Sequence, residues 1–417
     1  MNRVTTDKVY AATDFSTVSA RGVWHRPNDT GTETSASGVC DVLDKLQRAG
    51  VNLVFLETFY HGMAAFRSNY VPYNSGLAAF SYGEYEDYLS CFVAEAEKRG
   101  IEVHAWVEDF YVGVNENYFT RTFPDWIMLT DTGGVRQNEG KDYGGYIFLD
   151  PTNKDVTDYL TKFYDELLTK HPKVAGLNLD YIRYPVTDRN TDAGHTKSAI
   201  SAFCSQHGIS GQFDSASFAN YVSENGLYSA WVDFRANAVT EFVAGVFDMV
   251  KTSHRDKLLS TAIFPETQES YDKKKQDFRK WIDCGYLDIV TPMAYYDDNS
   301  TLKSELTKML ASCDSCYCYV GLSSTYHGLT GSKVLSQVDV CSQSGVDGFV
   351  FFGSKSVLEG KNGQDYVTLL NGKFGAVSAD LPHSAKISFY DKFVAPLADY
   401  LVSHGEAAND VATLTEQ

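Results

Sequence analysis

Cysteine is scarce in this sequence, with 8 residues in a chain of 417. That number is too small for a disulfide scaffold in a chain of this length. Cys313, Cys316 and Cys318 form a local cluster that resembles half of a zinc site, but no second pair of ligands follows at the usual spacing. Because the cluster leads directly into a strand pattern, we interpret these cysteines as buried free thiols.

Long apolar runs and an excess of basic residues are also missing. No apolar run approaches the roughly 20 residues that span a bilayer, so we predict no membrane insertion. Residues 1–19 are polar, and we expect no signal peptide in this chain. The 54 acidic residues outnumber the 36 basic ones, for a formal net charge of -18. Such an acidic surface argues against a nucleic-acid partner.

The motifs that bind common cofactors are absent as well. No Gly-x-Gly-x-x-Gly loop follows the first strand pattern, and neither a His-x-His nor a His-Glu-x-x-His pair occurs. We therefore predict no cofactor and no metal. A metal-dependent hydrolase, such as an amidase or deacetylase, stays open as an alternative, with candidate ligands His25, Asp29, His61, Glu57 and Asp180.

What the chain does contain is a regular alternation of strand and helix patterns. Apolar strand patterns occur at Gly22–Trp24, Asn52–Phe59, Val103–Val107, Val174–Asp180, Leu258–Phe264, Ile289–Tyr295, Tyr317–Leu322 and Gly348–Phe352. Helical patterns occur at Val39–Arg48, Tyr85–Arg99, Lys154–Lys170, Ser229–Lys251, Lys273–Asp283, Leu302–Ala311, Lys333–Ser344 and Phe389–His404. Eight such units predict an α/β fold in which parallel strands close into a TIM barrel. An open doubly wound sheet is the alternative.

The spacing of these units indicates where function was added. A bare strand-helix unit needs about 30 residues, and the spacing exceeds this after the second, third and fourth strands. The extra residues, near 60–82, 110–153 and 181–228, should form long loops at one side of the active-site face. We assign residues 1–375 to a single catalytic domain, and residues 376–417 to a C-terminal helix and tail packed on the barrel or trailing from it.

Polar residues gather at the end of the fourth strand pattern, at Asp180. Side chains alternate across a strand, so Leu177 and Leu179 should face the helices while Asn178 and Asp180 face the barrel interior. A carboxylate in that position is costly to bury without partners and is a candidate site residue. The alternative is a structural Asp, capped or paired with Arg183.

The third strand pattern supplies a second carboxylate by the same rule. His104, Trp106 and Glu108 should point inward, with Glu108 on the same rim as Asp180. Glycoside hydrolysis requires two carboxyl groups, one to protonate the leaving oxygen and one to attack or to activate water. Glu108 or Asp109 could instead only order the loop that follows, and His104 is expected to be an interior histidine.

Further carboxylates and aromatic residues follow other strands. Glu57, Glu266 and Asp297 come at or just after the second, fifth and sixth strand patterns. The chain has 27 Tyr, 25 Phe and 5 Trp, and several lie at strand ends or in the long loops. Amphipathic rings in such places suit sugars, whose C–H faces stack on them.

Six motifs occur along the chain in this order: Arg21–Trp24, Glu57–Gly62, His104–Trp106, Phe123–Trp126, Leu149–Pro151 and Asp180–Pro185. In order and spacing they resemble the family 10 glycosylhydrolase-like group of bacterial proteins, over about residues 20–360. The chain departs from that group at Ala175, where Asp is usual. The resemblance implies a glycosidase-type TIM barrel that processes polysaccharides and is usually exported, hence extracellular or in the cell envelope.

The leading hypothesis is a glycoside hydrolase with a carbohydrate substrate and an open oligomeric state. Asp180 is the preferred nucleophile or base and Glu108 the preferred acid, with Asp297, Glu266 and Glu57 as further catalytic candidates. The candidate substrate-binding residues are Trp24, His25, Tyr60, His61, Trp106, Asp109, Asn178, Arg183, Tyr184 and Tyr295. A catalytically silent glycan-binding barrel is the alternative from another class.

Overall fold

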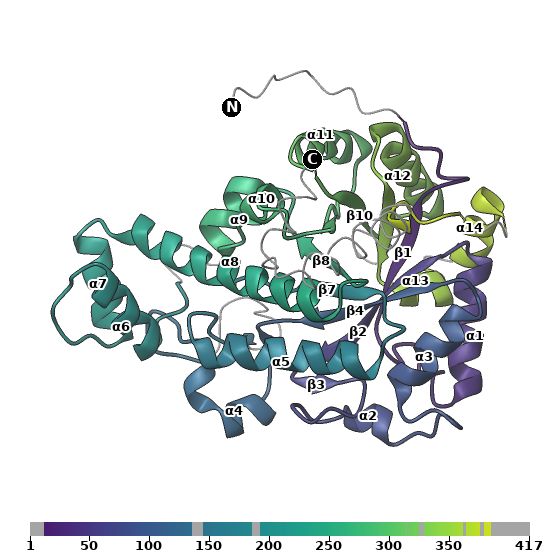
Figure 1. Cartoon of the computed structure of the whole chain (residues 1–417). Coiled ribbons are helices and arrows are strands. Elements are labelled where there is room, and N and C mark those ends of the chain that lie inside the picture. Colours follow the sequence, from purple (N-terminus) through teal and green to yellow (C-terminus); the bar gives the residue numbers. More distant parts are fainter. Residues whose placement is uncertain are drawn as a thin grey trace, which may run out of the picture.

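Eight parallel strands close into a barrel, as the sequence predicts. The strand order is β1-β11-β10-β9-β8-β7-β4-β2, and pairing of β1 with β2 closes the ring. The computed structural model describes residues 12–135, 145–185, 192–313, 315–324, 329–361, 364–375 and 379–384. Figure 1 shows the strands surrounded by helices.

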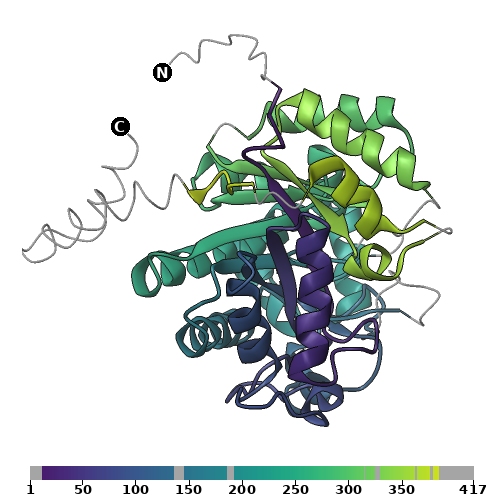
Figure 2. The same ribbon diagram turned by 90° about the vertical axis from the view of Figure 1, so that its right-hand side faces the viewer.

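The barrel strands begin and end close to the predicted positions. They are β1 (Ala20–His25), β2 (Leu53–Tyr60), β4 (Glu102–Glu108), β7 (Gly176–Asp180), β8 (Leu258–Ile263), β9 (Ile289–Pro292), β10 (Tyr317–Ser323) and β11 (Gly348–Phe352). The helices that follow them in turn are α1 (Ala36–Arg48), α3 (Tyr88–Glu97), α5 (Lys154–Lys170), α8 (Tyr228–Ser253), α9 (Thr267–Lys274) with α10 (Phe278–Asp283), α11 (Asn299–Leu310), α12 (Gly331–Ser344) and α13 (Ser354–Glu359) with α14 (Tyr366–Phe374). Figure 2 shows α1 and α14, from opposite ends of the chain, side by side on the outside of the barrel.

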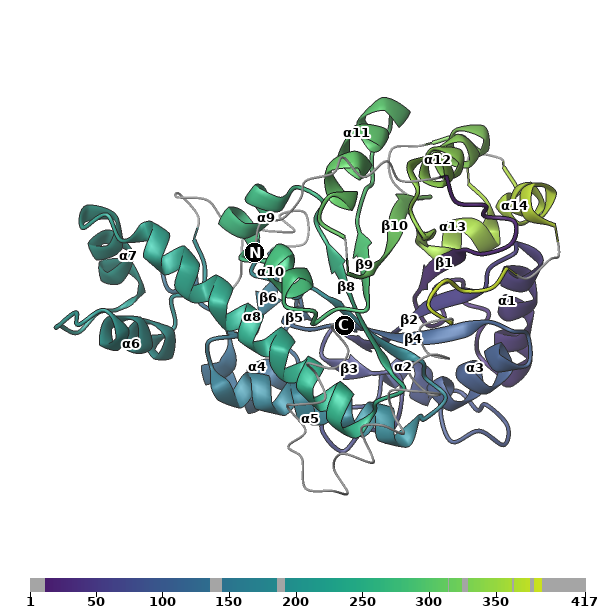
Figure 3. The ribbon, with the colours of Figure 1, turned by 45° about the horizontal axis from the view of Figure 1, so that its top comes forward.

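The predicted surplus after three strands forms extra elements. They are β3 (Met63–Ala64) and α2 (Ser75–Ala78) after β2, then β5 (Tyr111–Gly113), α4 (Tyr118–Thr122), η1 (Pro124–Trp126) and β6 (Ile147–Phe148) after β4, and α6 (Lys197–Gln206) and α7 (Ser215–Glu224) after β7. α6 and α7 pack on the start of α8 around Phe203, Phe218 and Trp231, away from the barrel (Figures 1 and 3).

Two apolar layers hold the barrel together. Trp24, Phe55, Trp106 and Tyr319 fill the interior, while the alternate residues of the same strands pack against the helices. This is the alternation that the sequence predicts for β4 and β7. It directs every second side chain of each strand toward the barrel axis, and the last inward residues reach the carboxyl rim.

Two predictions differ from the structure or lie beyond it. The helix predicted over Lys273–Asp283 is two helices, because Lys275 adopts a left-handed conformation with φ of 57° between α9 and α10. The predicted helix at Phe389–His404 lies outside the described residues, so the domain boundary at residue 375 stays a prediction. None of the eight cysteines, all of which lie among the described residues, forms a disulfide; Cys318 is buried, whereas Cys313 and Cys316 are half-buried.

Candidate active site

Asp180 lies at the carboxyl end of β7 with its side chain turned inward. Its Oδ2 accepts a hydrogen bond from the indole N–H of Trp106 at 3.0 Å, and its Oδ1 accepts one from the backbone N–H of Tyr181 at 2.7 Å. Tyr181 has a φ of 50°, a left-handed conformation in which its amide faces back to Asp180. Asp180 is half-buried, so it reaches the open face while two donors hold it in place.

Glu57 and Glu108 lie beside Asp180 and share one guanidinium group. Arg26 Nε lies 3.0 Å from Glu57 Oε2, and Arg26 Nη2 lies 3.8 Å from Glu108 Oε1. Glu108 Oε2 also accepts a hydrogen bond from the backbone N–H of His61 at 3.0 Å. Both glutamate side chains are fully buried, whereas Arg26 is 38% exposed. Arg26 therefore covers the carboxyl pair from the solvent side.

Burial changes the protonation of these groups. It raises the pKa of Glu57 to about 8, although the Arg26 charge opposes this shift. Burial and the nearby Glu57 charge raise the pKa of Glu108 well above its usual value. Burial also raises the pKa of Asp180, against the Tyr181 N–H, the Arg183 charge and the Trp106 N–H. Burial thus favours the protonated form of these three carboxyl groups, and the Arg26 charge acts in the opposite direction.

A strip of aromatic rings runs beside the carboxyl groups. Tyr60 stacks on His61 at 3.9 Å between ring centroids, and His61 meets Tyr111 at 5.2 Å. Tyr111 in turn lies 4.6 Å from both Tyr146 and Tyr181. All of these rings except Tyr111 are half-buried. The strip joins the loop after β2 to the end of β7, so it passes both Glu108 and Asp180.

A cavity of about 270 Å³ opens next to Glu57. Arg26, Asp29, Tyr60 and Asn74 contribute to its wall. A larger groove of about 440 Å³ lies between α5, α6 and α8 on the outer surface, away from the carboxyl groups. The cavity beside Glu57, and not the groove, adjoins the chemically reactive groups.

Two predicted substrate-binding residues form the layer beneath the site. The Trp24 indole N–H donates to Asn178 Oδ1 at 3.0 Å, and Asn178 Nδ2 donates to Ser260 Oγ at 2.9 Å. Asn178 has no exposed surface, and Trp24 is 2% exposed. Their inward direction agrees with the predicted alternation, but they support the floor of the site and are not open to a substrate.

Three other predicted substrate-binding residues are buried away from the candidate site, in contact with other parts of the protein. His25 is buried between Ser354 Oγ, 2.7 Å from its Nδ1, and Glu33, 3.0 Å from its Nε2. Asp109 accepts a hydrogen bond from Tyr164 of α5 at 2.7 Å. Tyr184 is fully buried, with the Arg235 guanidinium 5.6 Å from its ring centroid. These three side chains are therefore not open to a substrate.

The remaining predicted residues flank the site on the side of β8 and β9. The Arg183 guanidinium lies over the rings of Tyr181 and Phe264, at 4.8 and 5.2 Å. Tyr295 packs on Phe352 at 5.6 Å. Glu266 accepts a hydrogen bond from Tyr296 at 2.8 Å, and Asp297 is exposed. The contacts of Glu266 thus lie with Tyr296 and not with the Arg26 group.

Arg26 contacts both Glu57 and Glu108 and is not among the site residues predicted from the sequence. The alternation that turns Trp24 inward and His25 outward also turns residue 26 inward, so the signal was present one residue beyond β1. Tyr111 carries only the general signal of an aromatic residue at the start of a long loop, and the position of Tyr181 depends on a left-handed backbone conformation.

Together the barrel, the rim of carboxyl groups and the aromatic strip define a glycosidase-type α/β barrel. The chain belongs to the family described as glycosyl hydrolase-like 10, whose model matches residues 19–338. It is 26% identical over 284 residues to glycosyl hydrolase DigH of Escherichia coli strain K12, covering 61% of this chain and 57% of that protein. It is 22% identical to glycosyl hydrolase YngK of Bacillus subtilis, covering 61% and 48%. The matched region is thus only about half the length of these relatives.

Solved structures share the fold at low sequence identity. The β-amylase catalytic domain of Paenibacillus polymyxa superposes with a TM-score of 0.53 at 12% identity, covering 86% of this chain and 99% of that one. The endo-1,4-β-mannanase of Rhizomucor miehei gives 0.52 at 12% identity, covering 88% and 98%. In the described part of the chain, no helix has the length and apolar character to cross a bilayer.

Proposed function

We propose that this protein is a retaining glycoside hydrolase that acts on a glycan. The observation that carries the proposal is the grouping of Asp180, Glu108 and Glu57 on neighbouring strands, next to an aromatic strip. One of these carboxyl groups is held by N–H donors, and the other two are buried where protonation is favoured. A carboxylate that accepts N–H donors suits a nucleophile, which must be ionised, and a buried, protonated carboxyl group suits a general acid.

The register of the strands supports retention. Glu108 and Asp180 are direct partners across the β4–β7 pair, so their side chains leave neighbouring strands at the same level. Neighbouring strands are about 4.8 Å apart. This spacing favours carboxyl groups separated by about 5–5.5 Å, the retaining distance, over the roughly 6.5–9.5 Å that leaves room for an inverting water.

The proposed reaction has two steps. In the first, an Asp180 oxygen attacks the anomeric carbon while the bond to the leaving oxygen breaks, and the proton of Glu108 or Glu57 goes to that oxygen. In the second, the carboxylate left behind accepts a proton from water. The resulting hydroxide equivalent replaces Asp180 at the anomeric carbon and releases the sugar with its original configuration.

The aromatic strip supports a carbohydrate substrate. Sugar rings present C–H faces that pack on half-buried aromatic rings such as Tyr60, Tyr146 and Tyr181, while their hydroxyl groups bond polar neighbours. The strip extends over several rings on both sides of Glu108. We therefore propose a substrate with several sugar units, in agreement with the sequence-based expectation of a polysaccharide.

A panel of polysaccharides with reducing-end detection tests the proposal. Wild type should release reducing ends from at least one glycan, and NMR should show the product anomer unchanged. Asp180→Asn should lower kcat by about a thousandfold or more, and Glu108→Gln or Glu57→Gln should lose most activity except on substrates with good leaving groups.

The matched control is Asp248→Asn, which removes an exposed carboxylate of α8 outside the candidate site. It should leave activity near the wild-type level. Full activity of Asp180→Asn on a cleaved glycan would contradict the proposal.

One observation favours the glycan-binding alternative. Arg26 covers Glu57 and Glu108, which leaves both side chains without exposed surface. If wild type binds a glycan, Asp180→Asn binds it equally well, and neither cleaves any member of the panel, the binding function is correct and the hydrolase is not. The metal-dependent alternative lacks such support. Among the described residues, the cluster of three possible metal ligands is Glu102, His104 and His383, at the amino end of the barrel.

A further inference from the structure

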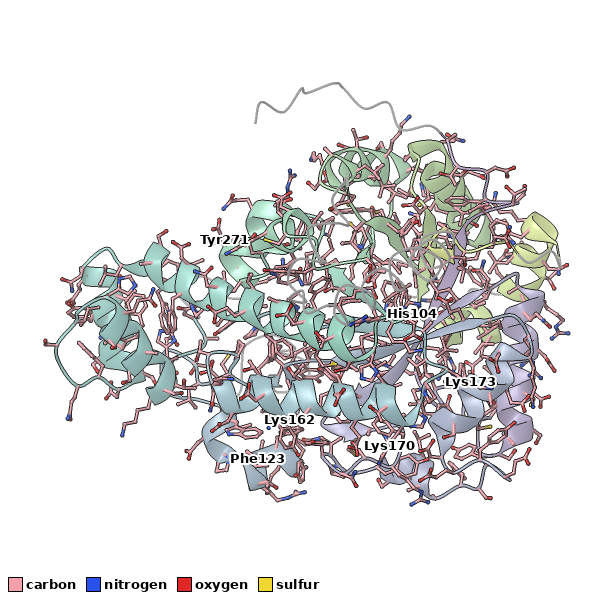
Figure 4. All side chains as sticks on the ribbon, in the orientation of Figure 1. His104, Phe123, Lys162, Lys170, Lys173 and Tyr271 are labelled. Atoms are coloured by element: carbon pink, nitrogen blue, oxygen red, sulfur yellow. The ribbon has the colours of Figure 1, made fainter. Side chains whose placement is uncertain are left out.

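The amino end of the barrel contains a second cluster of ionisable side chains. β4 begins with Glu102 and directs both Glu102 and His104 inward, since they are two residues apart on one strand. His383 reaches the same point from the segment 379–384, 281 residues after Glu102 in the sequence. In the view of Figure 4, His104 is labelled nearer to Lys173, which precedes β7, than to Phe123, in the long connection after β4.

The three side chains converge on one carboxylate oxygen. Glu102 Oε1 lies 2.8 Å from His104 Nε2 and 2.7 Å from His383 Nε2. The three donor atoms all lie within 4.8 Å of one another. Both imidazoles are completely buried, whereas the Glu102 side chain is 23% exposed. The cluster therefore has buried nitrogen donors and one side that opens to solvent.

The positions of these donors are fixed by other parts of the fold. Tyr319 Oη bonds His383 Nδ1 at 2.6 Å, which leaves Nε2 directed at the cluster. The backbone of Asp380 bonds Thr17 and Ser19, both at 3.0 Å. His104 donates from Nε2 to the Glu102 carboxylate at 2.8 Å, and its Nδ1 has no hydrogen-bonding partner among the described residues. The site is thus largely formed by the packing of the chain itself.

We propose that Glu102, His104 and His383 bind one divalent cation of the zinc type at the floor of the barrel. Two imidazole nitrogens and one carboxylate oxygen are a common zinc ligand set, and the exposed side of Glu102 leaves a position for water. Metal–ligand distances of about 2.1 Å in a tetrahedral arrangement require the donor atoms, now 2.8 and 2.7 Å apart, to separate by about 0.6–0.7 Å. Side-chain rotation can supply a movement of that size.

The proposed ion would have a structural function and would be separate from the catalytic face. Glu108 stands six residues after Glu102 on the same strand, or about 20 Å away. The ion would join the segment 379–384 to the first residues of β4, and a link that closes so long a loop of chain is expected to stabilise the fold.

The experiment uses the full chain without a histidine tag, stripped with a chelator and then titrated with Zn²⁺. We expect one equivalent to bind by calorimetry and by metal analysis after gel filtration. The melting temperature should rise by about 3 °C at a hundredfold excess over Kd. Mg²⁺, which prefers oxygen ligands, should neither bind nor stabilise.

Variants locate the ion. His383→Ala and Glu102→Gln should each lower Zn²⁺ affinity at least tenfold and reduce the thermal shift by half or more at the same Zn²⁺ concentration. The matched control is His254→Ala, which removes a histidine bonded to Asp165 at 2.8 Å outside the cluster and should bind Zn²⁺ normally. If a variant fails to fold, wild type in the presence of competing chelators of known affinity still reports the binding constant.

Two results would overturn the proposal. One is folded wild-type protein that binds less than a tenth of an equivalent at 100-fold excess Zn²⁺. The other is full binding in both cluster variants. Because the measurements need no substrate, they are independent of the proposed hydrolase activity, and Asp180→Asn should bind Zn²⁺ like wild type.

Discussion

Arg26 is the residue on which the electrostatics of the candidate site depend. Its guanidinium contacts Glu57 and Glu108 and lies over the rings of Tyr60 and Trp106, at 5.2 and 5.5 Å. Although burial acts against it, the two carboxylates raise the pKa of Arg26 above its usual value. The arginine is therefore always charged and lowers the pKa values of the acids beside it.

This arrangement predicts the pH dependence of catalysis. If Glu57 is the proton donor, kcat/KM should fall as the pH rises through about 8, where Glu57 loses its proton. In Arg26→Met the opposing positive charge is gone, so the pKa of Glu57 rises and the alkaline limb should move to higher pH. The pH profile of kcat/KM on a cleaved glycan measures this.

The control for that prediction is Arg67→Met, since Arg67 lies over the Tyr73 ring, outside the site. Its alkaline limb should remain near pH 8. An Arg26→Met limb that moves to lower pH would show that the carboxyl pair does not supply the proton.

At the scale of elements, the strands were the easiest part of the fold to predict. Each is a short apolar run, and seven of the eight are predicted to within two residues at both ends because burial on both faces leaves a continuous apolar pattern. α5 begins and ends at the predicted residues, since Asn153 caps its start and its apolar positions recur on one face.

The interruption between α9 and α10 shows why other elements were not predictable. Gln276 turns its side chain to the end of β8, where it accepts from the Phe264 N–H at 2.9 Å and donates to the Ala262 carbonyl at 3.2 Å. These partners are more than ten residues earlier in the chain, so the local helical pattern cannot show the break. The β5–β6 hairpin likewise depends on pairing between distant segments.

The same distinction holds for the candidate site. Alternation along β4 and β7 places Trp106, Glu108 and Asp180 on the inner face, as the sequence indicates. It gives no distance between strands, so it did not show that Glu57 and Glu108 share Arg26. The same alternation turns His25 and Asp109 away from the barrel interior, so it argues against both as substrate contacts.

Gly245 gives a prediction for α8. It lies in the middle of this 26-residue helix, and a Cβ at that position would meet no atom within 4 Å. Gly245→Ala should therefore stabilise the protein by roughly 0.5–1 kcal/mol, because alanine loses less backbone entropy on folding. Urea denaturation of both proteins measures the difference.

Gly348→Ala is the contrasting variant in the same experiment. Its Cβ would approach the Ala20 carbonyl oxygen to 2.3 Å across the β1–β11 pair, so this substitution should destabilise the barrel strongly. A loss of stability in Gly245→Ala would contradict the expected helix effect.

At the scale of the whole molecule, the two ends of the barrel differ in the segments that cover them. The three long connections all leave the carboxyl ends of their strands, and Figure 3 shows α4, α6 and α7 from two of them together at the left of the barrel. The amino ends are closed by Leu381 and His383, which pack against the interior layer and Glu102. Buried ionisable groups at both ends make the stability of the entire fold depend on pH.

We expect the protein to be more stable at pH 6.5 than at pH 8. Burial raises the folded-state pKa of Glu57 to about 8, and burial raises those of Glu108 and Asp109 well above their usual values. Stability from such groups is complete below an unfolded pKa of about 4.5 and is lost as the pH rises through the folded value. Lowering the pH from 8 to 6.5 should therefore raise the melting temperature by roughly 2 °C.

The histidines limit this gain at lower pH. Burial lowers the pKa values of His61 and His195 to about 4, so their contribution is present above the unfolded value of about 6.5 and is lost as the pH falls toward 4. Calorimetry at pH 8, 6.5 and 4 and constant ionic strength should give the highest melting temperature at the middle pH. Glu57→Gln should show a smaller rise between pH 8 and 6.5, because the glutamine does not titrate. A wild-type melting temperature that falls over that interval would mean that the buried carboxyl groups remain ionised, and it would remove the basis for a protonated acid at this site.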